Sequence, residues 1–393
     1  MANEHGSDDA TNYGRAVSPG ESADVAYSAL LDLASLSDDE LPQALAGHRD
    51  FVSPRHVERL IAHAHTTLGS DPRKATRLAR LATAVAAALR SPEVDAMEAV
   101  RLEGDAWREY ASALIEANEY HAARGAIRQA GTFYGIDAAR FMRELAILGL
   151  LEGRLLHILG DSEHGLLKIE QNGNWLKAFC EDAKMYVKAR TIYAYILLEM
   201  LRYEEALEVF EQAAELAREE EDGETLVYIL NNVGLCNLHL GDHERAPKCF
   251  EVALRMFEDL GLRQEMPRVR FNMAHILIAR GRYNEAISEF YKSRAEFLRL
   301  DLPVDAAGVG LLIASALFLA GRPHAVPALC EEMIATFMSA GLPHEARKAL
   351  AYLAEANRHG GISSGDVEHV RAFFDRLRDD PAVAFEPPPP HQV

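Results

Sequence analysis

Arg202-Tyr-Glu-Glu-Ala-Leu-Glu-Val-Phe210 is the stretch that decides the fold, because its pattern returns twice at a fixed interval. One interval later the sequence is Asp242-His-Glu-Arg-Ala-Pro-Lys-Cys-Phe250, and the next copy is Arg282-Tyr-Asn-Glu-Ala-Ile-Ser-Glu-Phe290. Each copy has an alanine followed four residues later by phenylalanine, and the alanines lie 40 residues apart. A fixed period of this size indicates a repeat architecture in which neighbouring units stack on one another.

Small residues at two further positions keep the same period and predict a pair of closely packed helices. One small residue follows each alanine by seven residues, and another precedes it by twelve. Helices with little side chain at matching points can approach closely, and we expect the phenylalanine four places on to pack into the next unit. Gly241 and Gly281 lie where the first helix of each pair should end, as capping glycines commonly do. The small residues are Ala194, Ala213, Gly234, Ala253, Ala274 and Ser293.

The repeat frame, meaning this set of small positions in each helix pair, extends in both directions to about seven units, from Leu102 to Leu377. Gly321 repeats the break at Gly281, and a further helix should begin near Ser364. We therefore predict an all-α fold, a right-handed α-solenoid of antiparallel helix pairs. The residues at the paired positions of the added units are Ala111 with Ala123, Gly153 with Gly165, and Ala314 with Val326.

The chain divides by pattern into four predicted parts. We expect a disordered acidic tail at residues 1–20, an N-terminal helical cap with one degenerate repeat at 21–100, the repeat array at 101–379 and a proline-rich tail at 380–393. Ser53-Pro54 and Asp71-Pro72 each place a capping side chain before a proline that suits the first helical position. The sequence leaves open whether the N-terminal helices cap the array or form a separate interaction module.

The combination of a small residue on the first helix with Ala-x3-Phe and a later small residue on the second resembles the tetratricopeptide repeat (TPR) family. The match is strongest from Arg190 to Ala295. The period of 40 residues exceeds the family's usual value of about 34 and resembles the long-period arrays of kinesin light chains and bacterial peptide sensors. This resemblance implies a superhelix of helical hairpins that binds a protein or peptide.

Charge and hydropathy argue against several classes of protein. The formal net charge is −19, with 41 Lys and Arg against 60 Asp and Glu, which disfavours binding to a phosphate backbone. Residues 1–20 lack the basic start and apolar stretch of a secretory signal. The longest strongly apolar stretch, Gly308 to Ala320, is shorter than the roughly 20 residues that span a bilayer. We predict a cytoplasmic protein that contacts neither nucleic acid nor a membrane.

The sequence predicts no enzyme, no metal site and no cofactor. His56, His63 and His65 are close in sequence, but His63 and His65 point to different helix faces, and no cysteine or carboxylate pair accompanies them at ligand spacing. There is no glycine-rich phosphate loop after a strand and no Gly-x-Ser-x-Gly motif. The cysteines form no Cys-x-x-Cys pair, and we expect them to act as small apolar residues.

Asn232 and Asn272 are the main candidates for a binding role. Each lies two residues before the small residue of its first helix, one full repeat apart, and first helices line the concave surface of such arrays. An asparagine amide both donates and accepts, so a ladder of them can bind the main chain of an extended peptide, as in TPR proteins that resemble this one. The ladder has two rungs, because Ile192 and Leu312 occupy the same position in the adjoining units. The alternative is that these amides bond a neighbouring helix. The flanking candidates are Lys188, Thr191, Tyr195, Asn231, His239, Arg268, Phe271 and His275.

Two functions fit these features. The first is a scaffold or adaptor that binds a peptide segment of a partner in the concave groove. The alternative is a bacterial signalling or transcription-related regulator that senses a peptide by protein contact without a DNA-binding domain of its own, because residues 22–90 lack a basic recognition helix. The sequence does not predict the partner or the oligomeric state.

Overall fold

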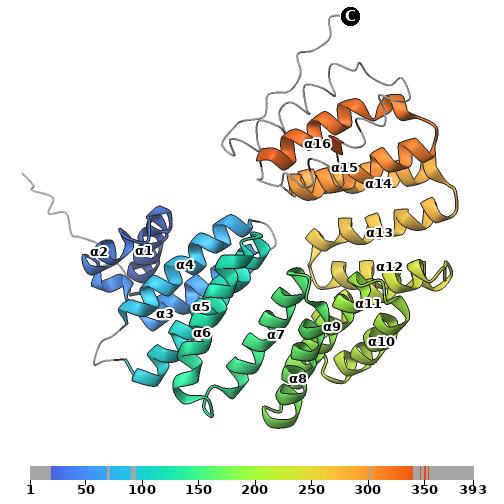
Figure 1. Cartoon of the computed structure of the whole chain (residues 1–393). Helices are drawn as coiled ribbons and strands as arrows, with labels where there is room; N and C mark the ends of the chain where they lie inside the picture. The colour runs from blue at the N-terminus through green and yellow to red at the C-terminus, as the bar shows by residue number, and fades with distance from the viewer. Residues whose placement is uncertain are drawn as a thin grey trace, which may run out of the picture. The chain divides into compact units, whose positions relative to one another are not determined.

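The computed structural model describes residues 19–339 except 69–70, 90–93 and 301, together with residues 346, 349, 350 and 353. Sixteen α-helices and no β-strand lie in this described part, so the predicted all-α fold of antiparallel helix pairs is confirmed (Figure 1). Residues 1–18 of the predicted acidic tail, the helix expected near Ser364 and the proline-rich tail lie outside it. None of the described helices is long and apolar enough to cross a membrane.

The chain divides into two compact units, Met1–Cys180 and Glu181–Val393. In the first unit α3 packs on α4, α4 on α5, α5 on α6 and α7 on α8. The helices of this unit are α1 (Pro19–Asp32), α2 (Leu41–Ala46), α3 (Pro54–Thr67), α4 (Pro72–Ala88), α5 (Ala96–Glu116), α6 (Tyr120–Tyr134), α7 (Met142–Ile158) and α8 (Ser162–Phe179), with 3-10 turns at Leu33–Ser35, Arg49–Phe51 and Gly135–Asp137.

In the second unit each helix packs against the next along the chain, and Figure 1 shows α14, α15 and α16 stacked in this way. Its first helices are α9, α11, α13 and α15, and its second helices are α10, α12, α14 and α16. The bounds are α9 (Ala183–Glu199), α10 (Tyr203–Glu219), α11 (Gly223–His239), α12 (Arg245–Asp259), α13 (Met266–Ala279), α14 (Tyr283–Arg299), α15 (Pro303–Leu319) and α16 (Pro327–Ser339), with 3-10 turns η4 (Arg263–Glu265) and η5 (Pro323–Ala325).

Two helix starts predicted from Ser-Pro and Asp-Pro are confirmed. The Ser53 hydroxyl accepts from the backbone N–H of His56 at 3.2 Å, and α3 begins at Pro54. The Asp71 carboxylate accepts from the N–H of Lys74 at 2.8 Å, and α4 begins at Pro72. Each cap satisfies an N–H that the helix itself leaves without a partner.

The small residues of the repeat frame lie where two helices touch. A Cβ atom on Gly153 of α7 would lie 2.8 Å from the carbonyl oxygen of Gly165 on α8, so only glycine allows this approach. A Cβ on Gly234 of α11 would lie 2.6 Å from the ring of Phe250 on α12. Phe250 shares a buried cluster with Val269 of α13, as expected of a ring that packs into the next unit, and its ring also covers the glycine of its own hairpin.

The turn between the two helices of a hairpin requires one residue with a positive φ. Gly241 has φ of 80°, and the N–H of the next residue bonds the carbonyl of Asn237 at 2.8 Å, which closes the end of α11. Leu201 holds the same position one repeat earlier with φ of 62°, and its side chain is 68% exposed. Leu201 therefore adopts a left-handed backbone conformation, which costs conformational energy, and its exposed side chain gains no burial in return.

Ala246→Leu is expected to lower the free energy of unfolding by about 1–3 kcal/mol, because Ala246 is fully buried and three added heavy atoms overpack the hairpin of α11 and α12. Urea unfolding followed by circular dichroism measures the change. The matched control Val252→Leu, on the exposed face of α12, should stay near wild type. Wild-type stability in Ala246→Leu would contradict the assigned register.

Leu201→Gly is expected to raise the free energy of unfolding by up to about 1 kcal/mol, since relief of the left-handed cost exceeds the added chain entropy of glycine. The reciprocal control Gly241→Ala should lower it by about 1 kcal/mol. Both are measured by the same unfolding experiment. A destabilised Leu201→Gly would show that the exposed leucine side chain makes a stabilising contact.

Candidate functional site

A cavity of about 580 Å³ lies in the second unit, and the first helices of its repeats supply most of its lining. The asparagines of the predicted ladder lie in this lining, beside apolar and charged residues. The lining residues are Tyr195, Tyr228, Asn231, Asn232, Leu235, Phe257, Glu265, Arg268, Val269, Phe271, Asn272, Phe297, Val304, Asp305, Gly308, Val309 and Phe337.

Three asparagine amides form the polar part of the lining. Asn272 of α13 is 7% exposed, and its Nδ2 donates to Oδ1 of Asn231 on α11 at 3.0 Å. This bond ties two neighbouring repeats together, as the alternative interpretation of the ladder expected. Asn232 is half-buried and its side chain has no hydrogen-bond partner among the described residues. Two amides thus join the helices, while the Asn232 amide keeps its donors and its acceptor unused by the described residues.

Three charged residues form another part of the lining. The Arg268 guanidinium donates to Asp305 Oδ1 of α15 at 2.8 Å and lies 3.8 Å from a carboxylate oxygen of Glu265. Burial raises the pKa of Glu265 despite the opposing effect of Arg268. Burial, together with Glu265 and Glu224, raises the pKa of Tyr228 to about 12, so its hydroxyl is protonated at neutral pH.

The apolar part of the lining comes from second helices as well as first helices. Phe257, Phe297 and Phe337 are buried and recur one repeat apart on α12, α14 and α16. Val269 and Val309 recur in the same way on α13 and α15. The repeat frame therefore places equivalent apolar side chains side by side in one cavity.

Of the ten residues predicted to bind a peptide, Tyr195, Asn231, Asn232, Arg268, Phe271 and Asn272 line the cavity. The other four lie outside its lining. Lys188 is exposed, and the Thr191 hydroxyl donates to the carbonyl of Val187 within α9 at 2.9 Å. The His239 ring stacks on Tyr203 at 4.5 Å. His275 lies edge-on to Phe271 and Phe290.

Sequence reasoning missed several lining residues that the repeat period identifies. Tyr228 and Gly308 lie one repeat to either side of Arg268, and Glu265 and Asp305 are equivalent positions of neighbouring repeats. Following the period from Arg268 would have found the first two. The three phenylalanines carried no comparable signal, because their spacing is equally typical of an ordinary core.

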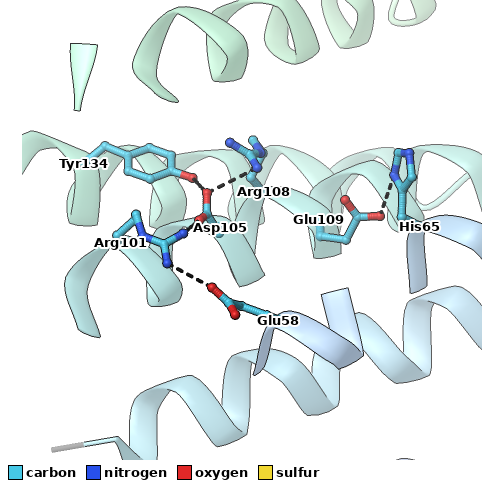
Figure 2. Close-up of polar contacts among 7 residues, drawn as sticks. All are labelled: Glu58, His65, Arg101, Asp105, Arg108, Glu109 and Tyr134. Atoms are coloured by element: carbon cyan, nitrogen blue, oxygen red, sulfur yellow. Dashed lines mark hydrogen bonds and ion pairs between the residues drawn. The ribbon is translucent and has the colours of Figure 1, made fainter. Parts of the chain in front are cut away.

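The first unit has a buried polar cluster of a different kind (Figure 2). Asp105 of α5 is 9% exposed, accepts from the Tyr134 hydroxyl at 2.8 Å and from Arg101 at 2.8 Å, and pairs with Arg108 at 3.2 Å. Burial raises the pKa of Tyr134, so that hydroxyl stays a donor. Arg101 also reaches Glu58 of α3 at 3.2 Å. These bonds join α3, α5 and α6. The Asp105 carboxylate is paired with two guanidinium groups and a hydroxyl of its own unit.

The three N-terminal histidines make separate contacts. His56 is buried, and its Nδ1 lies 3.0 Å from the carbonyl oxygen of Phe51. The Nδ1 atom of His63 lies 3.4 Å from the Tyr27 hydroxyl. His65 pairs with Glu109 at 3.3 Å, also visible in Figure 2. Within the described residues no group of three or more His, Cys, Asp or Glu side chains is placed to hold a metal ion.

A family model of the tetratricopeptide repeat matches residues 184–259, from α9 through α12. The two helix pairs α9–α10 and α11–α12 therefore match the tetratricopeptide repeat that the sequence pattern resembles. A comparison with curated proteins gives no match.

Solved structures share the fold at low sequence identity. The apo quorum sensor NprR from B. thuringiensis has a TM-score of 0.51 at 15% identity, over 91% of this chain and 97% of that one. A Rap protein complexed with competence and sporulation factor has a TM-score of 0.50 at 15% identity, over 87% and 99% of the two chains. A signal transduction ATPase with a tetratricopeptide repeat sensor, from Pyrococcus horikoshii, has a TM-score of 0.53 at 17% identity, over 93% and 55%. These likenesses concern the fold, and they confirm the expected structural resemblance to bacterial peptide sensors.

Tyr134→Phe is expected to lower the free energy of unfolding by about 1–3 kcal/mol, because buried Asp105 loses a hydrogen-bond donor. The control is Tyr120→Phe, whose hydroxyl bonds exposed Asn118 and whose loss should cost no more than about 0.5 kcal/mol. Chemical denaturation measures both. Equal, small effects would show that the Tyr134 hydroxyl is dispensable to the cluster.

His275 is expected to make the stability of the fold depend on pH. Burial, reinforced by nearby His239, lowers its pKa to about 4, whereas in the unfolded chain the pKa is near 6.5. Below pH 6.5 the His275 imidazole is protonated in the unfolded chain but stays neutral in the folded protein. The free energy of unfolding therefore falls as the pH drops from 6.5 towards 4.

His275→Leu, which copies Leu235 of the preceding repeat, should reduce the loss of stability between pH 7.5 and 4.5 by about 2 kcal/mol relative to wild type. Urea unfolding at a series of pH values measures it. Parallel pH profiles for the two proteins would show that His275 does not titrate as its burial requires.

Proposed function

We propose that this tetratricopeptide repeat protein is a scaffold or adaptor that binds an extended peptide segment of a partner protein over the cavity of its second unit. Tetratricopeptide arrays are a protein-binding fold, and stacked repeats present their first helices as a continuous binding surface. In this chain α11, α13 and α15 supply most of the cavity lining, which includes the amide, charged and apolar residues described above. Every group that the proposal needs lies in one unit.

The observation that carries the proposal is the half-buried Asn232 amide, which has no partner among the described residues, beside the Asn231–Asn272 bond. A peptide that covers this half-exposed amide displaces water from it, and the amide then loses free energy unless the peptide supplies hydrogen bonds in place of that water. The main chain of an extended peptide offers the alternating N–H and C=O groups that an amide can satisfy, whatever the peptide's sequence. The adjoining apolar cavity then supplies contacts for its side chains.

The second candidate function is a bacterial regulator that senses a peptide by protein contact. It is supported by the shared fold with the quorum sensor NprR and with a Rap protein complexed with competence and sporulation factor. The two candidates use the same cavity and differ in the consequence of binding. A sensor would change its affinity for a further protein when the peptide is bound, whereas an adaptor would hold the partner itself.

Asn232→Ala tests the proposal. We expect it to weaken binding about tenfold, since two lost hydrogen bonds of about 0.5–1 kcal/mol each approach the roughly 1.4 kcal/mol that corresponds to a factor of ten. The probes are peptides selected on the full chain from a random octapeptide library, and fluorescence anisotropy measures their dissociation constants. Thermal melting should be unchanged, because the Asn232 side chain makes no hydrogen bond with the described residues of the fold.

Asn284→Ala, on the exposed face of α14 outside the cavity, is the matched control and should bind as wild type does. Adding Asn272→Ala to Asn232→Ala should weaken binding further, and melting then reports the loss of the bond to Asn231. Unchanged affinity in Asn232→Ala, or a parallel loss of fold and binding, would show that this asparagine is structural.

A further inference from the structure

Gly308 opens the cavity at a position where the preceding repeats carry large side chains. The equivalent residues one, two and three repeats earlier are Arg268, Tyr228 and Lys188. Gly308 lies within α15, and a Cβ atom built on it would meet nothing within 4 Å. This glycine is therefore required neither by a tight helix contact nor by a special backbone angle. Its effect is to leave space in the lining.

The side chains around that space are apolar. Val304 and Val309 lie on α15 to either side of Gly308, and Phe297 and Phe337 lie on the flanking helices α14 and α16. Both rings are 2% exposed, so they form the packed base of the cavity, and half-buried Val304 is the apolar side chain beside Gly308 that a ligand can cover. Such a surface favours a bulky aliphatic or aromatic group, because free energy is gained in proportion to the apolar area removed from water.

The charges beside this space disfavour one kind of ligand residue. Glu265 and Asp305 bring two carboxylates to the lining and Arg268 brings one guanidinium, which leaves one negative charge in excess when all three are ionised. The side chains of Glu265, Asp305 and Arg268 are 23%, 28% and 52% exposed, so solvent screens them only in part. An acidic residue next to the apolar group would meet net repulsion.

We infer that the space over Gly308 receives a bulky apolar side chain of the bound peptide, with no acidic residue beside it. This inference rests on the proposed peptide binding and specifies which peptides bind. In this proposal Asn232 binds the peptide main chain without regard to sequence, and the space over Gly308 selects the side chain.

The test compares wild type with Gly308→Leu and Gly308→Ala in the full chain. Peptides selected on wild type from a random octapeptide library should share a bulky apolar residue at one position and be depleted of Asp and Glu beside it. Gly308→Leu fills the space and should weaken these peptides at least tenfold, whereas Gly308→Ala should weaken them less. Glu265→Gln should relax the depletion of acidic residues.

Gly125→Leu is the matched control, because Gly125 is a helical glycine of α6 with nothing within 4 Å of a built Cβ and lies in the first unit. It should bind like wild type, and both leucine variants should melt no lower than wild type, since leucine favours helix over glycine. Selected peptides without a shared apolar residue, or with unchanged affinity for Gly308→Leu, would overturn the inference and leave the proposed function standing. If wild type selects no peptide at all, the proposed function itself fails.

Discussion

The close approach of two helices at a pair of small residues is the constraint on which the rest of this structure depends. At Gly153 and Gly165 the approach is backbone to backbone, and at Gly234 the glycine makes room for the ring of Phe250. Because this contact recurs every 40 residues in the second unit, equivalent residues of successive repeats lie next to one another in space. Residues that are 40 positions apart in the sequence are therefore neighbours on one surface of the array.

The two units differ in how the polar side chains between their helices are satisfied. In the first unit, Asp105 is buried among Tyr134, Arg101 and Arg108, and the cluster is closed to further partners by its own hydrogen bonds. In the second unit, Asn232 has no partner among the described residues, and Gly308 leaves open space in the cavity lining. The same architecture thus holds a polar cluster closed by its own hydrogen bonds in one unit and, in the other, a cavity whose lining includes an amide with no partner among the described residues.

Much of the fold could be predicted from the sequence, and less of the site. The period, the paired small residues and the caps at Ser53 and Asp71 depend on local rules, so they could be read from residue type and spacing. Six of the ten predicted contact residues line the cavity because the period also fixes which face of a first helix they share. The division after Cys180 has no local signature, and the bond between Asn272 and Asn231 depends on side-chain rotamers across two repeats. Spacing alone does not determine either of them.

In the proposed complex a peptide lies along the first helices over the cavity of the second unit. The most direct measurement is photo-crosslinking of a selected peptide that carries a benzophenone side chain at its apolar position, followed by mass spectrometry of the adducts on the full chain. We expect adducts within 228–235, 268–272 and 304–309, which contain the lining residues of α11, α13 and α15. Adducts confined to the first unit, or to the exposed faces of α10, α12 and α14, would contradict it.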